Sequence, residues 1–378
     1  MTFIVKTYGC QMNVHETEKI EARLFGMGYT RASGDEEADI VVFNTCCVRD
    51  TAEQKIISHI GNTGRLKRAN PKKIICVVGC LSQRENSAQQ LRKKFPFIDI
   101  ILGTHNIVSL GDKVKQVISN RSKIIEIKDQ RDMDDDKAGH VMRRDENAAY
   151  INITFGCENY CAYCIVPYVR GKLVSRKIQD VQEEFRQIIN GENPPRVVFL
   201  LGQNVNSYVC PETGASFITL LEHLCDITLH SNSPVLINFL SSHPKDFSKE
   251  LVETIASNQS IERNIHLPLQ SGCDKILKLM NRGYTVQQYT DKIQMLRQAV
   301  PGVCITTDII CGFPGETEED FEQTIETVKA IRFNAAFIFP YSRRTGTVAT
   351  KMEGQVDMKV KKARTTKLIK LMRELSKI

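Results

Sequence analysis

Short apolar runs alternate with helical patterns along the amino-terminal part of the chain, and this alternation restricts the possible folds most. The runs FIVKTYGC (3–10), ADIVVFNTC (38–46) and KKIICVVGC (72–80) are typical of buried strands. Segments with helical spacing follow each of them, at 13–28, 51–70 and 83–95. Strands and helices that alternate through short loops predict a parallel sheet covered by helices, so the sequence indicates an α/β fold.

Each of these three predicted strands ends in a cysteine, namely Cys10, Cys46 and Cys80. Parallel strands end at the same edge of a sheet, where such folds bind their ligands, so we expect the three thiols to converge. Three thiols at one edge predict a metal site. Cys47 can point to the opposite side and Cys76 is expected in the core, so neither is counted as a ligand.

The cysteine count supports this interpretation. The chain of 378 residues has 13 cysteines and begins without a secretory signal, so we expect a cytoplasmic protein whose thiols serve metal or redox chemistry. Scattered buried cysteines acting as small hydrophobic residues are the alternative. No apolar run is long enough to span a membrane, and 51 basic against 44 acidic residues permit a nucleic-acid partner without requiring one.

A second set of cysteines, Cys157, Cys161 and Cys164, has the spacing CxxxCxxC. Thiolates select iron–sulfur clusters, zinc or copper(I). Three of them can hold one face of a 4Fe-4S cluster and leave the fourth iron for a non-protein ligand. A structural zinc ion would need a fourth protein ligand, and none lies close in the sequence.

The rest of the chain predicts a barrel. Six segments have the strand pattern, at 150–157, 196–206, 235–244, 264–272, 302–314 and 334–344, with helical stretches near 178–190, 218–227, 246–257, 286–299 and 317–332. They indicate a partial (β/α)6 relative of the TIM barrel, whose active site gathers at the carboxyl ends of the strands. Polar residues there are Gln203, Asn204, Ser241, Ser242, His243, Gln270 and Asp308. Each alone is equally typical of a satisfied polar residue at a loop mouth.

Eleven ordered motifs identify a family. They are YGCQMN, NTCCVR, GCLSQR, GCENYCAYCIVPYVRG, VSR, LLGQNVN, SSHPKDF, HLPLQSG, MNRGYT, TTDIICGFPGET and YSRRTGT. With them the chain resembles the methylthiotransferases among the radical S-adenosylmethionine (SAM) enzymes over nearly its whole length. It is most similar to the branch that makes 2-methylthio-N6-dimethylallyladenosine in tRNA, at the adenosine next to the anticodon.

The resemblance implies two 4Fe-4S clusters, an auxiliary one on Cys10, Cys46 and Cys80 and a SAM cluster on Cys157, Cys161 and Cys164. It implies two SAM molecules per turnover: one methylates a sulfur on the auxiliary cluster, and the other gives the radical that takes hydrogen from C2 of the base. Tyr163 would lie near the adenine of SAM. The SAM contacts would be Tyr163, Gln203, Ser241, Gln270 and Asp308. A flavodoxin or ferredoxin would supply electrons to a monomeric enzyme.

We expect an amino-terminal methylthiotransferase domain at 1–120, a linker at 121–147, a radical SAM core at 148–354 and a basic helix at 355–378. Family members usually continue into a small RNA-binding TRAM domain, and this chain ends at Ile378, where that domain would begin. The basic residues of the last segment, which could contact phosphates, are Lys359, Lys361, Lys362, Arg364, Lys367 and Lys370. Packing of Leu368, Leu371 and Leu375 on the barrel is the favoured alternative.

Other functions stay open at this stage. The substrate could instead be threonylcarbamoyl-adenosine in tRNA or an aspartate of a ribosomal protein. A non-enzymatic iron–sulfur protein, for electron transfer or binding, would have no SAM pocket, whereas polar strand ends predict one.

Overall fold

The computed structural model describes residues 1–378 except 48–49, 85, 131–140, 232 and 376–378. The chain forms two compact units. The first comprises Met1–Glu146 and Ile165–Lys172, and the second comprises Asn147–Cys164 and Leu173–Ile378. A short segment that follows the second set of cysteines therefore belongs to the first unit.

The first unit is a parallel sheet of six strands in the order β2-β1-β3-β4-β5-β6. The strands are β1 (Thr2–Thr7), β2 (Thr30–Arg31), β3 (Ile40–Thr45), β4 (Ile74–Gly79), β5 (Ile100–Leu102) and β6 (Ile124–Glu126). Every residue of β3 and β4 is buried, as expected for central strands covered on both faces.

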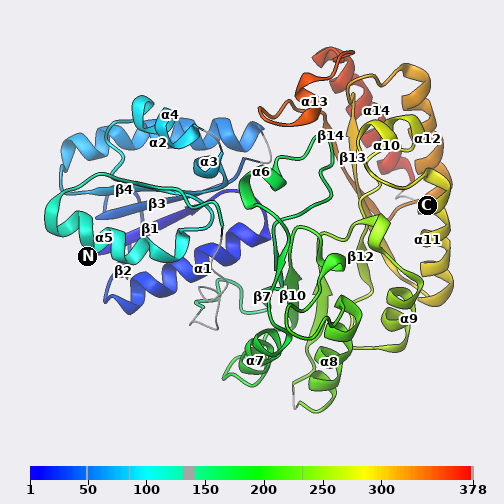
Figure 1. The fold of residues 1–378 in the computed structure, drawn as a ribbon, viewed down its shortest axis with the longest axis horizontal. Helices are drawn as coiled ribbons and strands as arrows, with labels where there is room; N and C mark the ends of the chain where they lie inside the picture. Colours follow the sequence, from blue (N-terminus) through cyan, green and yellow to red (C-terminus); the bar gives the residue numbers. More distant parts are fainter. Residues whose placement is uncertain (48–49, 85, 131–140, 232, 376–378) are drawn as a thin grey trace. The chain divides into compact units, whose positions relative to one another are not determined.

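Helices cover both faces of this sheet, as Figure 1 shows. The helices of the unit are α1 (Gln11–Gly26), α2 (Asp50–Ala69), α3 (Cys80–Gln83), α4 (Ser87–Lys94), η1 (Ile107–Ser109), α5 (Leu110–Asn120) and α6 (Val166–Arg170). On one face, Leu24 of α1 and Val114 of α5 pack on the sheet. On the other face, Ile60 of α2 and Leu91 of α4 do so. This is the parallel α/β sheet that the sequence predicts. Strand β6 lies within the segment 121–147, and part of that segment, 131–140, falls outside the described residues.

The second unit contains six parallel strands in two sheets, ordered β11-β10-β7 and β12-β13-β14. They are β7 (Ala148–Asn152), β10 (Val197–Leu201), β11 (Leu236–Phe239), β12 (Asn264–His266), β13 (Cys304–Cys311) and β14 (Ala335–Pro340). An isolated parallel bridge from Ile237 to Ile261 connects the sheets, and β8 (Thr154–Phe155) pairs with β9 (Val174–Ser175) in antiparallel fashion. The predicted partial (β/α)6 barrel is confirmed.

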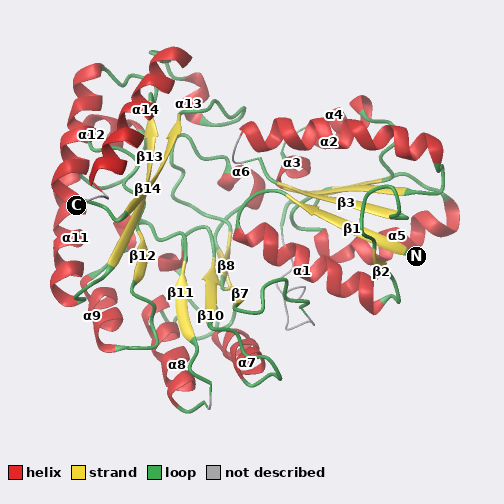
Figure 2. Ribbon diagram, turned by 180° about the vertical axis from the view of Figure 1, so that it is seen from behind, coloured by secondary structure: helices red, strands yellow, loops and turns green. Residues whose placement is uncertain are grey.

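Helices surround these strands, as Figure 2 shows. They are α7 (Ile178–Ile189), η3 (Val205–Ser207), α8 (Phe217–Leu229), η4 (Pro244–Asp246), α9 (Lys249–Ser257), α10 (Asp274–Leu279), α11 (Val286–Ala299), α12 (Glu318–Ile331), α13 (Val348–Lys351) and α14 (Met358–Leu375). Helix α12 begins at a capping box, in which Thr317 Oγ1 accepts from the Asp320 amide and Asp320 Oδ2 accepts from the Thr317 amide. None of the helices in the described residues is long and apolar enough to cross a membrane.

The basic carboxyl-terminal helix α14 packs on the barrel. Leu368 is fully buried in the barrel core, and Leu371 and Leu375 pack against the same core. The Arg364 guanidinium is also buried and donates to Glu316 at 2.8 Å and to Glu318 at 3.0 Å. Lys361 is buried and Lys367 pairs with Glu322. The packing alternative therefore describes this helix, and Lys361 and Arg364 are not exposed phosphate contacts.

Candidate active site

Glycines bring together the loops that carry the first set of cysteines. Cys10 follows β1, Cys46 follows β3 and Cys80 follows β4, so all three stand at the carboxyl edge of the sheet. Gly9 has φ +127°, and a Cβ atom there would lie 2.6 Å from the Cβ atom of Cys46. Gly79 has φ +100°, and a Cβ atom there would lie 2.6 Å from a backbone oxygen. Only glycine permits both backbone conformations and such close packing.

Hydrogen bonds between Asn13 and Asn44 hold the same edge of the sheet in place. Asn13 Nδ2 donates to Asn44 Oδ1 and to the Thr45 carbonyl, both at 3.1 Å. Asn44 Nδ2 in turn donates to the Asn13 carbonyl at 2.8 Å. Both side chains are fully buried, so these bonds tie the start of α1 rigidly to the end of β3.

Cys47 does not point away from this edge, contrary to the possibility considered from the sequence. It is fully buried, and its thiol donates to Cys80. Strand β3 ends at Thr45, so the alternation of side chains along a strand no longer applies to the pair Cys46 and Cys47. Four cysteines therefore share the edge. Cys76, within β4, lies in the core as predicted.

These contacts change the acidity of the thiols. The hydrogen bond from Cys47 is the largest influence on Cys80, and with the charge of Arg170 it lowers the pKa of Cys80 to about 6 against the effect of burial. The same hydrogen bond, together with burial, raises the pKa of Cys47. Cys80 is thus prepared as a thiolate, the form that binds metal, while Cys47 stays protonated.

Arg170 was not found from the sequence, because it follows the second set of cysteines in the chain. It lies in α6, which belongs to the first unit, and its guanidinium donates to the sulfur atoms of Cys80 and Met12. Thr104 Oγ1 donates to the Val169 carbonyl at 2.8 Å and so anchors α6. The motif PYVRG is the only sequence signal that could have drawn attention to this arginine.

The second set of cysteines occupies a loop that follows β8. The Cys164 amide donates to the Cys161 carbonyl at 2.8 Å and closes a turn. Asn281 Nδ2 donates to the carbonyls of Asn159 and Tyr160, at 3.2 and 3.1 Å, and holds the first part of the loop. Burial and the neighbouring Cys161 raise the pKa of the Cys157 thiol in the metal-free chain.

Arg282 is the cation at this second set of cysteines, and sequence analysis missed it too. Its Nη1 donates to Cys161 Sγ at 3.3 Å, its Nη2 to the Pro268 carbonyl at 3.1 Å and its Nε to Tyr284 Oη at 3.0 Å. The guanidinium is buried. The motif MNRGYT contains both Asn281 and Arg282, so this motif supports the cysteine loop.

The predicted SAM contacts differ in position. Gln203 and Ser241 follow the ends of β10 and β11, and Gln270 follows β12. Asp308 lies inside β13 rather than at its end, and its Oδ2 is 3.4 Å from His266 Nε2. Tyr163 packs edge-on against Phe313, with ring centroids 6.5 Å apart.

Buried polar atoms without a hydrogen-bond partner in the described chain gather where the barrel strands end. An unpaired buried polar atom costs about 1–3 kcal/mol, so such a group indicates a polar ligand. SAM, with its amino, carboxylate, hydroxyl and adenine groups, offers the matching donors and acceptors. The residues with such atoms include Asn152, Thr154, Asn204, Asn206, Ser242, His243 and Gln270.

Among these residues, His243 has a ring whose protonated nitrogen atom can be identified. Burial, with the charges of Arg282 and Lys245, lowers the pKa of His243 to about 2, so the ring is neutral. Its Nδ1 accepts from the Lys245 amide at 3.2 Å. The single proton is therefore on Nε2, which can donate to a ligand.

Within the described residues, no group of three or more His, Cys, Asp or Glu side chains is arranged to hold a single metal ion. A 4Fe-4S cluster makes a different demand, because each thiolate binds a separate iron and the sulfur atoms stand further apart. Two sets of soft thiols, each with a buried arginine that donates to one of its sulfur atoms, are chemically suited to such clusters.

Comparison with known families divides the chain in two. Residues 2–103 match the uncharacterized protein family UPF0004, and residues 151–328 match the radical SAM superfamily. Among solved structures, the radical SAM methyltransferase TsrM from Kitasatospora setae, with cobalamin and a [4Fe-4S] cluster bound, has a TM-score of 0.67 at 13% identity, over 92% of this chain and 76% of that one. OxsB, a cobalamin-dependent SAM radical enzyme, has a TM-score of 0.62 at 11% identity, over 99% of this chain and 56% of the OxsB chain. At such identities the likeness concerns the fold alone.

Curated relatives are much more similar in sequence. A protein of Desulforamulus reducens is 41% identical over 99% of this chain and 80% of its own length. A protein of Clostridium novyi is 43% identical over 99% of this chain and 81% of its own length. A protein of Carboxydothermus hydrogenoformans is 42% identical over 99% of this chain and 84% of its own length. All three are named tRNA-2-methylthio-N(6)-dimethylallyladenosine synthase.

Proposed function

Since this chain belongs to the family of tRNA-2-methylthio-N(6)-dimethylallyladenosine synthases, we propose that it adds a methylthio group to C2 of N6-dimethylallyladenosine next to the anticodon of tRNA. It is a radical SAM methylthiotransferase. One observation carries the proposal: the chain has two sets of three cysteines, one at the ends of three parallel strands of the first unit and the other in a single loop after β8 of the second unit. A sulfur-inserting reaction needs two kinds of chemistry, and each set serves one.

In the second unit, Cys157, Cys161 and Cys164 would hold the SAM cluster. When bound, the cluster and SAM supply a carbon radical, which is able to take hydrogen from an aromatic C–H that no side-chain base can deprotonate. Arg282 orients Cys161 through its hydrogen bond of 3.3 Å. The Nε2–H of His243 and the Oε1 atom of Gln270 are available to bind and orient SAM.

In the first unit, Cys10, Cys46 and Cys80 would hold the auxiliary cluster. The product gains a sulfur atom, and an iron without a protein ligand is a suitable carrier for it. Three thiolates leave one such iron, whereas four would leave none. The hydrogen bond from the Cys47 thiol to Cys80 supports three ligands rather than four, because it gives Cys47 a role as a donor beside the ligand set.

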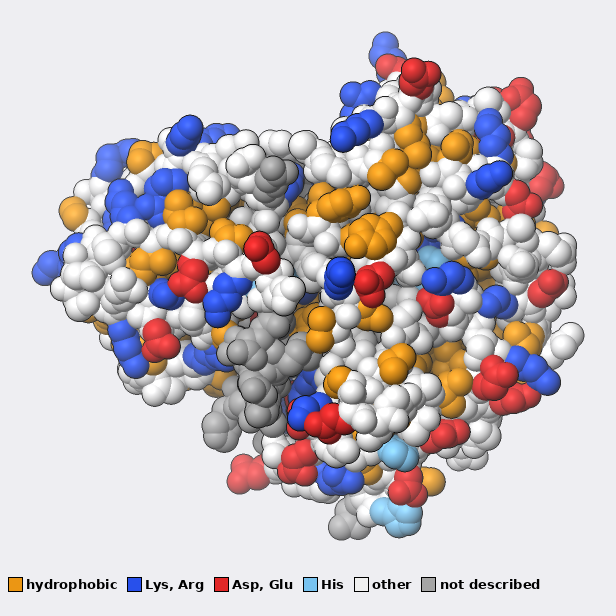
Figure 3. Space-filling view, in the orientation of Figure 1, with side chains coloured by type: hydrophobic (Ala, Val, Ile, Leu, Met, Phe, Trp, Pro, Cys, Tyr) orange, Lys and Arg blue, Asp and Glu red, His pale blue; other side chains and the backbone are white. Residues whose placement is uncertain are grey.

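The substrate and partners follow from this assignment. The adenosine has to leave the stack of the anticodon loop to expose C2, as it does in other enzymes that modify a base. In Figure 3, Lys and Arg side chains are frequent over the first unit. Two of its helices, α2 and α4, end in exposed basic residues that suit phosphates: Arg68, Lys93 and Lys94. We further propose a cytoplasmic monomer that receives electrons from a flavodoxin or ferredoxin.

Nucleoside analysis of tRNA tests the proposed substrate. The reconstituted enzyme, with SAM and dithionite, is given tRNA that carries either dimethylallyladenosine or threonylcarbamoyl-adenosine. We expect methylthiolation of the first tRNA alone, detected by mass spectrometry, and no product with the Cys157→Ala, Cys161→Ala, Cys164→Ala variant. Product only on threonylcarbamoyl-adenosine would overturn the substrate assignment. A protein that makes neither product nor 5′-deoxyadenosine would instead be a non-enzymatic iron–sulfur protein.

A further inference from the structure

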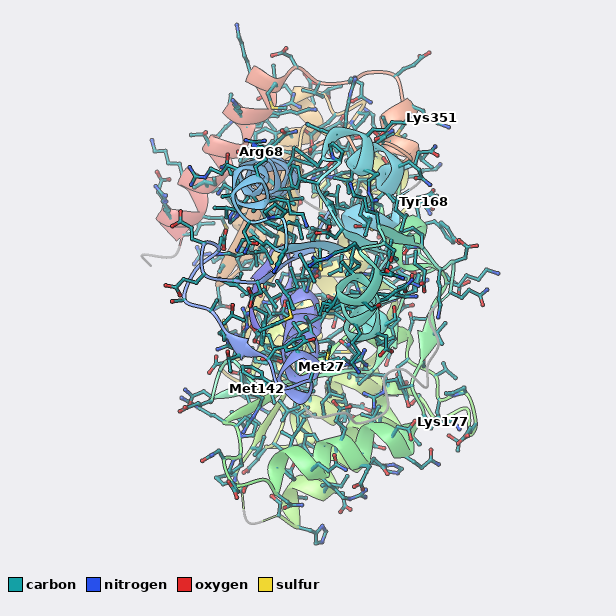
Figure 4. The ribbon with its side chains drawn as sticks, turned by 90° about the vertical axis from the view of Figure 1, so that its left-hand side faces the viewer. Met27, Arg68, Met142, Tyr168, Lys177 and Lys351 are labelled. Carbon is teal, nitrogen blue, oxygen red and sulfur yellow. The ribbon has the colours of Figure 1, made fainter. Side chains whose placement is uncertain are left out.

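Arg170 is a buried cation whose surroundings are anionic. Helix α6 exposes Tyr168 at its surface, as Figure 4 shows, with 49% of that side chain accessible, whereas Arg170 is only 8% accessible. The guanidinium donates to Cys80 and lies near Cys10 and Glu16. A guanidinium group stays protonated even when it is buried, so Arg170 carries a positive charge inside the first unit.

A buried charge without a partner is costly, so this arginine requires anions in the first unit. Glu16 supplies one negative charge and is itself buried. A metal-bound Cys80 would supply another as a thiolate, and the hydrogen bond that it accepts from Arg170 would then be charge-assisted. A cluster held by three thiolates would add to this demand, because three thiolates outweigh the positive charge of the iron–sulfur core, and reduction by one electron makes the site more anionic still.

We propose that Arg170 is a positioning residue for the auxiliary cluster: it fixes the Cys80 thiolate by a charge-assisted hydrogen bond, and its positive charge stabilises the reduced cluster. Hydrogen bonds and charges near the sulfur ligands are established means of setting the potential of such clusters. This inference rests on the proposed auxiliary cluster at Cys10, Cys46 and Cys80.

The experiment isolates the first unit's cluster within the full chain. In the Cys157→Ala, Cys161→Ala, Cys164→Ala background, only the auxiliary site can take up iron. We expect Arg170→Gln to lower the ratio of reduced to oxidised cluster at least tenfold at a fixed potential, a shift of ~59 mV for a one-electron couple. Iron analysis and an anaerobic redox titration followed by electron paramagnetic resonance measure this. Arg170→Lys keeps the charge without the planar fork and should give a smaller shift.

Two further variants exclude indirect effects. Tyr168→Ala changes the exposed side chain of the same helix and should titrate like the background protein. The Arg170→Gln substitution should still lower the reduced fraction when Glu16→Gln is also present. If the shift disappears with Glu16→Gln, the arginine serves that glutamate alone and the proposal is wrong.

The outcomes separate this inference from the proposed function. No iron in the background protein overturns the auxiliary cluster itself. A normal iron content with superimposed titrations for Arg170→Gln and the background overturns only the role of Arg170. If Arg170→Gln takes up no iron, the thermal unfolding of its metal-free form distinguishes a positioning role from a structural one. An unchanged unfolding temperature, together with a restored iron content in Arg170→Lys, supports the positioning role. A lower unfolding temperature without restoration in Arg170→Lys means a structural role and contradicts the proposal.

Discussion

Four cysteines share the sheet edge of the first unit, although a cluster with one open iron takes only three. Cys46 and Cys47 are neighbours in sequence, and the hydrogen bond from Cys47 to Cys80 brings the second of them into the group. This hydrogen bond distinguishes two of the four thiols, because it lowers the pKa of Cys80 to about 6 and raises that of Cys47. Cys47 is thus a hydrogen-bond donor beside the three proposed ligands.

Substitution of Cys47 tests this division. We expect Cys47→Ala to keep the full iron content and to form methylthio product, because it removes a donor and no ligand. Cys80→Ala should lose the auxiliary cluster, since only two of the three ligands then remain. Iron analysis of both variants after anaerobic reconstitution makes the comparison. If Cys47→Ala loses as much iron as Cys80→Ala, Cys47 is itself a ligand.

His243 makes the second unit sensitive to acid. Its folded pKa of about 2 lies below the ordinary value of 6.5, so the unfolded chain takes up a proton first as the pH falls. The stabilisation is complete above pH 6.5 and is lost progressively below it, by about 2 kcal/mol between pH 7.5 and 5. Urea unfolding of the metal-free protein should show this loss, and His243→Asn should reduce it. Equal losses in both proteins would contradict the assignment of a neutral, buried His243.

At the scale of elements, patterns of apolar residues identified the long strands and helices but not the short ones. Strands β2, β5 and β6 have two or three residues each, too few for a periodicity to be detected. Helix α6 has five residues, and its membership of the first unit depends on tertiary contacts such as that of Thr104 with Val169. Local sequence contains no information on such contacts, so Arg170 could not be assigned to a site.

For the candidate site, the sequence likewise predicted the residues that form local patterns but not those that reach the site from distant segments. The cysteines were found because the spacing CxxxCxxC and the strand ends are local patterns. Arg282 was missed because it reaches Cys161 from a distant segment. Asp308 was placed at a strand end, yet β13 continues to Cys311, because the apolar run gives no exact boundary.

Helix α14 packs on the barrel, and we expect its exposed lysines to contribute little to tRNA binding. Leu368→Ala removes a fully buried side chain and should destabilise the protein by about 2–5 kcal/mol. Alanine at the exposed Lys359, Lys362 and Lys370 should leave both stability and tRNA affinity nearly unchanged. Denaturant unfolding and a salt titration of tRNA binding measure the two effects. A log–log salt slope flattened by roughly 0.7 to 0.9 per lysine removed would show that these lysines contact phosphates after all.

At the scale of the whole molecule, the proposed function assigns a separate cluster site to each of the two units. We expect about eight irons per chain after anaerobic reconstitution and about four in each triple alanine variant, because each set of cysteines is proposed to hold one 4Fe-4S cluster. Iron and acid-labile sulfide analysis of the three proteins measures this. An unchanged iron content in the Cys157→Ala, Cys161→Ala, Cys164→Ala variant would show that the barrel cysteines hold no cluster.

The division of labour between the units is the central claim, and the Cys10→Ala, Cys46→Ala, Cys80→Ala variant tests it most directly. The variant is incubated with SAM, dithionite and tRNA that carries dimethylallyladenosine, and both 5′-deoxyadenosine and methylthio nucleoside are quantified by mass spectrometry. We predict that 5′-deoxyadenosine still forms, because the barrel cysteines are intact, while the methylthio nucleoside is absent, because the sulfur has no carrier. Methylthio product at the rate of the unmodified enzyme would contradict the account.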